Sequence, residues 1–246
     1  MTAPALVLLP GLDGTGLLFR PLLAALPPRC DPRVVAYPVG DSASYEEALP
    51  RVLEALPRSG RFVMLSESYS GPLALKAAAL QPDGLAGVVL CATFVSNPQR
   101  LVSRRLAGLV RPWLFRWFPT FTQVKALLGG YATPELRLLS RDALSKVEPS
   151  VLAARVRSIL AVDVEAELRD CAVPVLYLRG ERDRVVPLRN LRRMQQLLPS
   201  MEVSVLPAPH LVLQTQPVLA AKRIVQFLDD LDSDAGAGAA DSRASP

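Results

Sequence analysis

The sequence predicts an α/β fold with a mostly parallel central sheet of about six strands flanked by helices. Short runs rich in Val and Leu alternate with helical patterns along most of the chain. Most of these runs are apolar throughout rather than at every second residue, which is typical of strands buried on both faces. The predicted strands are residues 6–9, 33–37, 62–66, 87–92, 175–178 and 203–206.

Helical patterns occupy the intervals between these strands. The predicted helices are residues 17–26, 45–56, 71–80, 188–198 and 218–228. Ser44 and Glu47 form a capping-box signature at the start of the second of these helices. Such regular alternation indicates parallel strands connected by helices that cover both faces of the sheet.

The alternation stops at about Val95 and resumes at about Val173. The stretch between them has a helical pattern, in which Thr133 followed by Pro134 is a good helix start. Because this stretch interrupts one sheet, we predict a single α/β domain at 1–232 with a helical cap inserted at about 96–165. Residues 233–246 contain no large apolar side chain and are predicted to be disordered.

Composition indicates one large, well-filled core. Half of the 246 residues are hydrophobic and the mean hydropathy is +0.25. No apolar run approaches the roughly 20 residues of a membrane span, and the N-terminal apolar run is too short for a signal peptide. Three scattered cysteines argue against a disulfide framework, so a cytoplasmic location is expected.

Positive charge is concentrated in the predicted cap. Residues 98–157 contain eleven Lys or Arg and three Asp or Glu, a balance of +8, whereas the whole chain carries +5 and the remainder therefore −3. A basic insert could favour anionic substrates or a membrane surface. We favour the simpler interpretation that these charges lie on solvated helix faces. Nucleic acid is not expected as a partner.

Ser68 is the candidate nucleophile. A predicted strand runs into Ser66-Glu67-Ser68-Tyr69-Ser70-Gly71, and a helix follows. A sharp strand-to-helix turn requires small residues two positions before and after the nucleophile, and only Ser68 has them, namely Ser66 and Ser70. Both serines stand where the usual Gly-x-Ser-x-Gly motif has glycines. The alternative is a serine-rich loop that caps the helix.

A glycine-rich segment follows the first predicted strand and reads Leu8-Leu9-Pro10-Gly11-Leu12-Asp13-Gly14-Thr15-Gly16. An acyl-transfer site needs two backbone N–H donors for the oxyanion. We expect them at Leu12, within this segment, and at Tyr69, after the nucleophile. A phosphate-binding loop is the rival interpretation, but the glycine order does not match and no Lys-Ser or Lys-Thr follows. The third interpretation is a tight turn that has no catalytic or binding role.

The candidate acid and base each follow a later predicted strand. Asp183 suits the carboxylate that orients the imidazole, with Glu181 as the alternative acid and a surface salt bridge as the non-catalytic interpretation. His210, the only histidine, lies between the last strand and the C-terminal helix. The chain order Ser68, Asp183, His210 is that of Ser-Asp-His triads on this type of sheet. The carboxyl ends of the parallel strands would bring them together.

With Ser68, Asp183 and His210 in this order, the sequence resembles the α/β-hydrolase superfamily over nearly its whole ordered length. The resemblance includes the pattern Val-Pro-Val-Leu-Tyr-Leu-Arg-Gly-Glu-Arg-Asp-Arg-Val-Val-Pro around Asp183 and the stretch from Val162 to Leu168. The Leu-Pro-Gly-Leu-Asp-Gly-Thr-Gly loop is similar to that of phytyl ester synthase-like acyltransferases and of uncharacterised bacterial hydrolases. The serines at 66 and 70 depart from the family pattern.

These features predict a serine hydrolase that acts on a carboxylic ester or thioester through an acyl-enzyme. Its partner is a small-molecule ester with an apolar acyl or alcohol part, and neither a metal nor a cofactor is implied. An apolar cap that includes Trp113 and Trp117 predicts a lid over the acyl pocket, although these side chains could merely pack the cap onto the body. Membrane contact by the cap is not expected.

Two alternatives to a serine hydrolase stay open at this point. One is an acyltransferase that uses an alcohol acceptor, and the other is a non-catalytic ligand-binding module.

Overall fold

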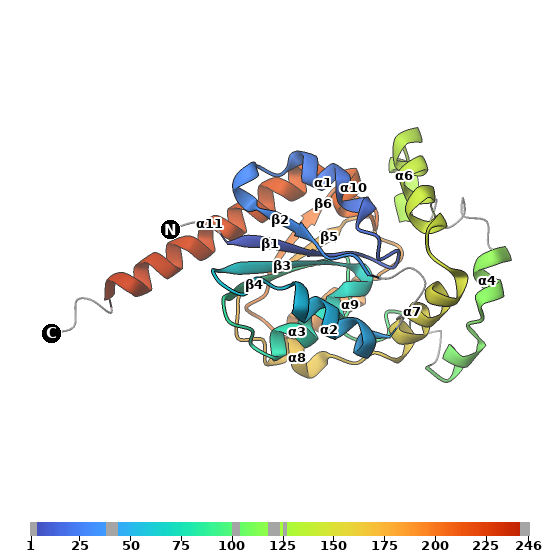
Figure 1. Cartoon of the computed structure of the whole chain (residues 1–246), viewed down its shortest axis with the longest axis horizontal. Coiled ribbons are helices and arrows are strands. Elements are labelled where there is room, and N and C mark those ends of the chain that lie inside the picture. Colours follow the sequence, from blue (N-terminus) through green and yellow to red (C-terminus); the bar gives the residue numbers. More distant parts are fainter. Residues whose placement is uncertain (1–3, 38–43, 100–103, 118–123, 125–126, 242–246) are drawn as a thin grey trace.

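The computed structural model describes residues 4–37, 44–99, 104–117, 124 and 127–241. Its described residues form one parallel sheet of six strands in the order β2-β1-β3-β4-β5-β6 (Figure 1). The predicted fold class is confirmed, and all six predicted strands are present. The strands are β1 Ala5–Leu9, β2 Pro32–Val34, β3 Phe62–Glu67, β4 Leu85–Cys91, β5 Val175–Gly180 and β6 Glu202–Leu206.

The burial of each strand follows from its place in the sheet. All residues of the central strands β3 and β5 are buried, which accounts for the apolar runs Phe62–Leu65 and Val175–Leu178 with which they begin. The edge strand β6 has a mixed pattern, and Val205 is exposed. The other edge strand, β2, ends at Val34 rather than at residue 37, because the Tyr37 N–H donates to Gly14 O in the glycine-rich loop at 2.7 Å instead of continuing the ladder.

Two helical layers cover the sheet. One contains α1 Arg20–Ala25, α10 Val212–Thr215 and α11 Pro217–Asp241, and the other contains α2 Tyr45–Ala55, α3 Gly71–Ala79, α8 Glu165–Arg169 and α9 Leu188–Leu197. Alternate residues of each strand face each layer, so that Leu6 and Leu8 pack with the first and Val7 and Leu9 with the second. The predicted capping box of Ser44 and Glu47 begins α2.

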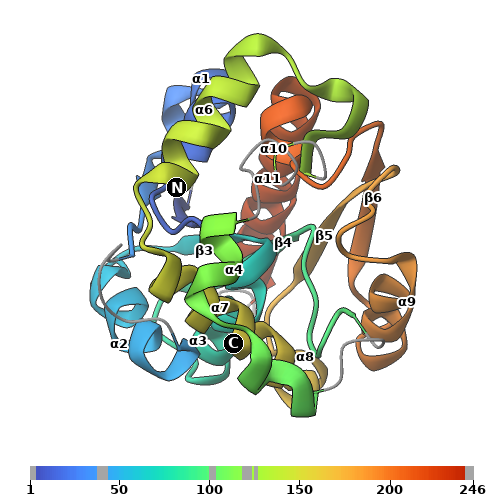
Figure 2. The same cartoon turned by 90° about the vertical axis from the view of Figure 1, so that its right-hand side faces the viewer.

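The helical insertion forms a cap beyond the sheet (Figures 1 and 2). It contains η4 Arg104–Leu109, α4 Pro112–Trp117, η5 Gly129–Tyr131, α6 Pro134–Ser145 and α7 Pro149–Ala161. Its two ends meet at an antiparallel bridge between Ser96 and Asp163, where the Val164 N–H also donates to Val95 O at 2.8 Å. Both chain crossings between body and cap therefore occur at one place.

The C-terminal helix extends into the segment for which disorder is predicted. α11 ends at Asp241, and residues 242–246 lie outside the described part, so the disorder of 233–246 stays a prediction. The expectation rested on the absence of large apolar side chains. The segment also contains four alanines and two glycines at 235–240, which have opposite helix propensities, so its composition alone does not decide its structure.

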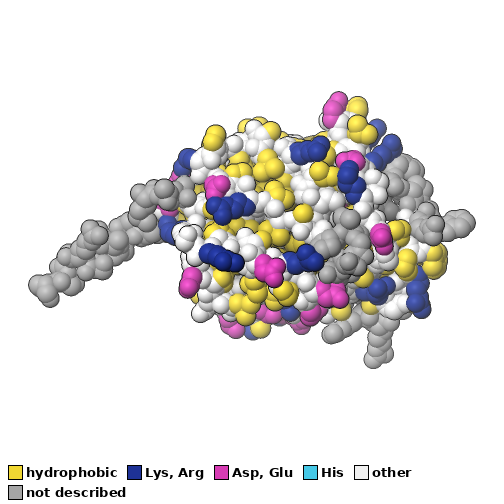
Figure 3. Space-filling view, viewed as in Figure 1, with side chains coloured by type: hydrophobic (Ala, Val, Ile, Leu, Met, Phe, Trp, Pro, Cys, Tyr) yellow, Lys and Arg dark blue, Asp and Glu magenta, His cyan; other side chains and the backbone are white. Residues whose placement is uncertain are grey.

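The surface carries no large field of one sign on the face shown in Figure 3, where Lys and Arg are interspersed with Asp, Glu and hydrophobic side chains. Among the described helices, none has the length and apolar composition needed to cross a bilayer. Cys30, Cys91 and Cys171 are all free thiols.

Substitution of Phe227 measures how much packing of the first helical layer against the sheet contributes to the free energy of unfolding. Phe227 is 1% exposed on α11, and its ring lies against Gly87 of β4. We expect Phe227→Ala to lower the free energy of unfolding by roughly 3–5 kcal/mol, because it removes a buried ring and leaves a cavity. Urea denaturation followed by circular dichroism measures this change.

Val218→Ala is the matched control, since Val218 lies on the same helix and is 70% exposed. It should change stability by less than about 0.5 kcal/mol. Equal losses in the two variants would contradict the assignment of Phe227 to the core.

Candidate active site

Ser68 lies at the sharp turn between β3 and α3. The turn is a short 3₁₀ segment, η3 Ser68–Ser70, and the φ angle of Ser68 is +48°. A non-glycine residue in this left-handed region is strained and persists only where its surroundings hold it. The turn presents the Ser68 side chain beyond the carboxyl edge of the sheet.

Hydroxyl hydrogen bonds explain how serines stand where this turn usually has glycines. Ser66 Oγ donates to Val89 O of β4 at 3.3 Å. Ser70 Oγ donates to Pro10 O and lies 2.7 Å from Tyr37 Oη. Both side chains are fully buried, and each hydroxyl has a partner, so neither carries the cost of an unpaired buried polar group.

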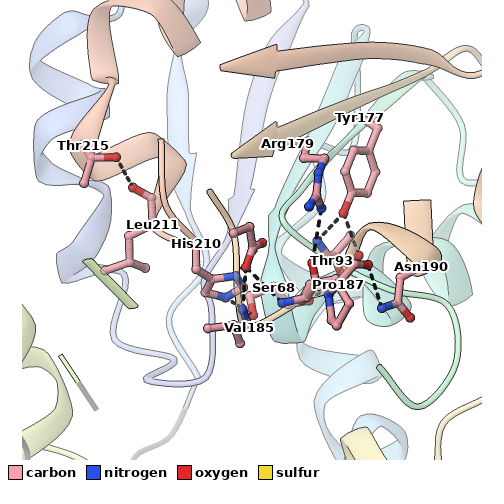
Figure 4. Close-up of polar contacts among 12 residues, drawn as sticks. Ser68, Thr93, Tyr177, Arg179, Val185, Pro187, Asn190, His210, Leu211 and Thr215 are labelled. Atoms are coloured by element: carbon pink, nitrogen blue, oxygen red, sulfur yellow. Dashed lines mark hydrogen bonds and ion pairs between the residues drawn. The ribbon is translucent and has the colours of Figure 1, made fainter. Parts of the chain in front are cut away.

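Gly71 is the position in this turn where no side chain fits. A Cβ there would lie 2.0 Å from Thr93 Oγ1. That hydroxyl donates to Ser68 O at 2.5 Å, while Tyr177 Oη donates to Thr93 O at 2.8 Å (Figure 4). The close approach of Thr93 therefore fixes the peptide that follows Ser68.

The structure brings Ser68, His210 and Asp183 into one hydrogen-bonded chain. His210 Nε2 lies 3.0 Å from Ser68 Oγ (Figure 4). His210 Nδ1 lies 2.9 Å from Asp183 Oδ2. The side chains of His210 and Asp183 are 2% and 0% exposed. The misaligned residues expected of a non-catalytic module are not found.

Asp183 is held by the loop after β5. Its Oδ1 accepts hydrogen bonds from the N–H groups of Val185 and Val186 at 2.8 and 3.0 Å. Burial alone would raise the pKa of this carboxyl, but hydrogen bonding and charge attraction from His210, with the two backbone bonds, hold it below the usual value. The alternative acid, Glu181, is exposed, so geometry favours Asp183.

The two expected oxyanion donors lie on either side of the nucleophile. Leu12 follows β1 and lines the same cavity as Ser68, and Tyr69 is the next residue along the turn. Neither amide donates a backbone hydrogen bond to another described residue. The Tyr69 ring is buried and stacks on Tyr45 at 4.7 Å, and Tyr45 Oη donates to Tyr69 O at 3.0 Å.

A cavity of about 560 Å³ opens onto Ser68 and His210. Most of its lining is apolar and comes from both cap and body. The cap contributes Val110, Leu114, Phe115, Val156, Ile159 and Leu160, and the body contributes Leu18, Phe94, Val185 and Leu211. Such a space suits an apolar group attached to a reacting carbonyl.

Trp113, which was expected to bind substrate, does not line the cavity beside Ser68. Its side chain is 57% exposed and is not among the described residues that line the cavity. Successive residues of a helix are about 100° apart, so α4 turns Leu114 and Phe115 inward and Trp113 outward. The side chain of Trp117 lies outside the described residues.

Two buried carboxyls lie beside the triad without belonging to it. Glu67, directly before Ser68, is 1% exposed, and its carboxyl accepts a hydrogen bond from Gln214 Nε2 at 3.0 Å. Burial and the nearby Asp13 raise the Glu67 pKa to about 7. Asp13 is 2% exposed; its Oδ2 accepts from Thr15 N, and its Oδ1 has no hydrogen-bond partner among the described groups.

Three residues near the site were not predicted from the sequence. They are Thr93 and Glu67, described above, and Arg155 of the cap helix α7, which is buried and donates a hydrogen bond to Leu12 O. Thr93 acts through a contact between segments far apart in the chain, which no local pattern reveals. Glu67 stands between two serines and Arg155 is one of eleven basic residues at 98–157, so neither has a local pattern that reveals its burial. No group of three or more His, Cys, Asp or Glu side chains in the described part of the chain could hold a metal ion.

The sheet, the insertion and the hydrogen-bonded Ser-His-Asp chain define an α/β hydrolase. The sequence model of the family described as "Serine aminopeptidase, S33" matches residues 44–212. The match spans more than half of the chain, so the protein belongs to this family of the α/β-hydrolase superfamily.

Comparison with named proteins indicates the kind of reaction. A pimeloyl-[acyl-carrier protein] methyl ester esterase of Xanthomonas campestris pv. campestris is 31% identical over 203 residues, which are 76% of this chain and 80% of the relative. A putative carbamate hydrolase, RutD, of Stutzerimonas stutzeri is 27% identical over 223 residues, 83% of each chain. The protein is accordingly a carboxylesterase-like hydrolase.

Solved structures of low sequence identity share the fold. A thermophilic esterase from Thermogutta terrifontis superposes with a TM-score of 0.77 at 21% identity, covering 94% of this chain and 91% of the other. An esterase from Exiguobacterium antarcticum gives a TM-score of 0.79 at 13% identity, with coverages of 93% and 92%.

Glu67 predicts a specific pH dependence of stability. Its ordinary pKa is 4.5 and its pKa in the folded chain is about 7, so between these values the folded chain keeps a proton that the unfolded chain has lost. Stability therefore falls as pH rises through this window and levels off above it. Glu67→Gln removes the effect, and its stability relative to wild type should rise by on the order of 2 kcal/mol from pH 5 to pH 8.

Urea denaturation of both proteins across this pH range measures the difference. Glu54→Gln, a change at an exposed position of α2, is the matched control. A difference between Glu67→Gln and wild type that stays constant with pH would contradict the raised pKa.

Proposed function

We propose that the protein hydrolyses a carboxylic ester or thioester through an acyl-enzyme at Ser68, with His210 as base and Asp183 as its orienting carboxylate. The observation that carries this proposal is the continuous hydrogen-bonded chain from Ser68 Oγ through His210 to Asp183, at 3.0 and 2.9 Å. A nucleophile, a base within hydrogen-bond reach of it and a group that orients the base are the three parts of such a site.

Acylation begins when Ser68 Oγ attacks the acyl carbon and His210 Nε2 takes the hydroxyl proton. The carbonyl π electrons move to oxygen, which becomes the oxyanion. Asp183 stabilises the imidazolium, because its carboxylate stays ionised beside His210. The tetrahedral intermediate collapses, the bond to the leaving oxygen or sulfur breaks, and His210 returns the proton to that atom.

The oxyanion is placed between the amides of Leu12 and Tyr69. Two backbone donors aimed at the developing charge are the usual arrangement, and removing one donor from such a site typically costs roughly 10²–10³ in kcat. Both amides lack other described backbone acceptors, which leaves them available for this role.

Deacylation repeats the sequence with water. His210 removes a proton from water, the hydroxide oxygen attacks the acyl carbon, and the free acid leaves as Ser68 Oγ regains its proton. Each step uses side chains of this protein, its backbone amides and water, so the scheme requires no metal or organic cofactor.

The apolar cavity supports a small-molecule ester whose acyl or alcohol part is apolar. Its volume of about 560 Å³ lies within the range of small-ligand pockets. Cap side chains such as Leu114 and Phe115 form part of the lining, so the cap excludes water from one side of the reacting group. The exposed Trp113 is not part of this proposal.

Labelling with a fluorophosphonate tests the nucleophile. The reagent phosphonylates an activated serine with loss of fluoride, and peptide mapping should place the adduct on Ser68. Ser68→Ala should abolish labelling and lower kcat for an ester such as p-nitrophenyl butyrate by roughly 10⁴-fold or more, because acylation has no nucleophile.

Ser145→Ala, at an exposed position that ends α6, is the control and should label and turn over like wild type. The proposal fails if the folded wild type remains unlabelled, or if Ser68→Ala retains full ester turnover.

An acyltransferase is the second candidate. It is favoured by the apolar cavity under the cap, which can hold an alcohol acceptor and exclude the competing water. The acyl-enzyme would be the same, and His210 would deprotonate the alcohol instead of water.

Product analysis separates the two outcomes. An acyl donor is supplied with a long-chain alcohol, and free acid and new ester are quantified by chromatography. The hydrolase predicts free acid as the main product, whereas new ester in excess of free acid would establish transfer. If only free acid forms, the transferase is excluded for that alcohol class.

A further inference from the structure

We propose that Arg155, on the cap helix α7, is a positioning residue that sets the geometry of the oxyanion site and so makes catalysis depend on the seating of the cap. The inference rests on the proposed function, because it needs Leu12 and Tyr69 as the oxyanion donors. Arg155 is separate from the Ser68–His210–Asp183 chain, and its described contacts include both donor residues.

Arg155 is buried although it belongs to the cap. It is 1% exposed and reaches the glycine-rich loop after β1, where Nη1 donates to Leu12 O at 2.8 Å. Burial lowers the Arg155 pKa, but a guanidinium remains charged in proteins. A charged donor to a carbonyl in a buried setting makes a strong hydrogen bond.

This contact completes the restraint of both peptides that flank Leu12. The Gly14 N–H donates to Gly11 O at 3.0 Å, which fixes the peptide that carries the Leu12 N–H. Arg155 fixes the next peptide through Leu12 O. With both peptides held, the backbone rotations at Leu12 are set, and with them the direction of its N–H.

The same guanidinium also contacts the second donor residue. Its central carbon lies 5.8 Å from the centre of the Tyr69 ring and 5.7 Å from that of Tyr37. Both distances are within the range of cation–π attraction. Tyr37 Oη in turn lies 2.7 Å from Ser70 Oγ in the turn after the nucleophile. One cap side chain thus joins both halves of the oxyanion site.

The loop has a shape that accommodates this side chain. Gly14 has a φ angle of +68°, and a Cβ at that position would lie 2.6 Å from Arg155 Nη1. Glycine therefore leaves the space that the guanidinium occupies. The Leu12 side chain packs against a cluster that includes Val151 and Leu152, which lie on the same helix as Arg155. A shift of α7 would move both the side chain and the carbonyl of Leu12.

Kinetics with Arg155→Met and Arg155→Lys distinguish positioning from simple attachment of the cap. Methionine keeps the apolar stem and removes the donor and the charge. Because the oxyanion site serves the transition state, we expect Arg155→Met to lower kcat by roughly 10- to 100-fold while KM changes by less than about threefold. Lysine restores the charge and one donor, so it should recover part of the loss.

A trifluoromethyl ketone matched to the ester provides the second readout. Ser68 Oγ adds to its carbonyl carbon, the hydroxyl proton passes to His210, and the carbonyl electron pair becomes an oxyanion. The inhibition constant of this adduct should rise with the loss in kcat, so that the ratio of inhibition constant to KM increases by about 10-fold or more in Arg155→Met. This ratio does not depend on how much of the protein is folded.

Arg157→Met is the matched control, because Arg157 lies on the same helix and donates to Val110 O within the cap at 3.0 Å. For Arg157→Met, both kcat and the ratio of inhibition constant to KM should stay within about twofold of wild type. A ratio unchanged in Arg155→Met, or raised equally in Arg157→Met, overturns the role of Arg155 and leaves the proposed function standing. A ketone that does not inhibit wild type would instead contradict the proposed function itself.

Discussion

The left-handed turn at Ser68 is the constraint on which the other features of the site depend. A residue with φ of +48° costs on the order of 1 kcal/mol, so neighbouring groups must hold it there. These groups come from several segments. A carbonyl of β4 accepts a hydrogen bond from Ser66, and a carbonyl of the loop after β1 accepts one from Ser70. The Thr93 hydroxyl donates to the carbonyl of Ser68. The sheet supplies these partners because its strands are parallel and in register, which brings the ends of β1, β3 and β4 to one edge.

Much of this arrangement could be predicted from the sequence, because the relevant information is local. Short runs rich in Val and Leu located the six strands, and residue size around Ser68 selected one serine among three. Asp183 and His210 were located by their positions after strands, and the parallel sheet brings them within hydrogen-bond distance of each other although they are 27 residues apart. The choice between Asp183 and Glu181 required the structure, since both follow β5 and only their burial differs.

Features that depend on packing between distant segments could not be predicted. The composition of the cap indicates an apolar lid but not which side of α4 faces the cavity, and it is Leu114 and Phe115 rather than Trp113 that line it. Arg155 looked like one more charge in a basic insert, and its contact with Leu12 joins residues 143 positions apart.

The bridge between Ser96 and Asp163 has a consequence for how this protein can diverge. Because the cap leaves and rejoins the body at adjacent positions, insertions or deletions within it do not alter the spacing between β4 and β5. Evolution can therefore exchange or resize the cap, and with it the shape of the cavity, while the serine, histidine and aspartate stay where they are. A cap without a residue equivalent to Arg155 would remove the hydrogen bond that the carbonyl of Leu12 now accepts, so an exchange of the cap would also change the loop beside the serine.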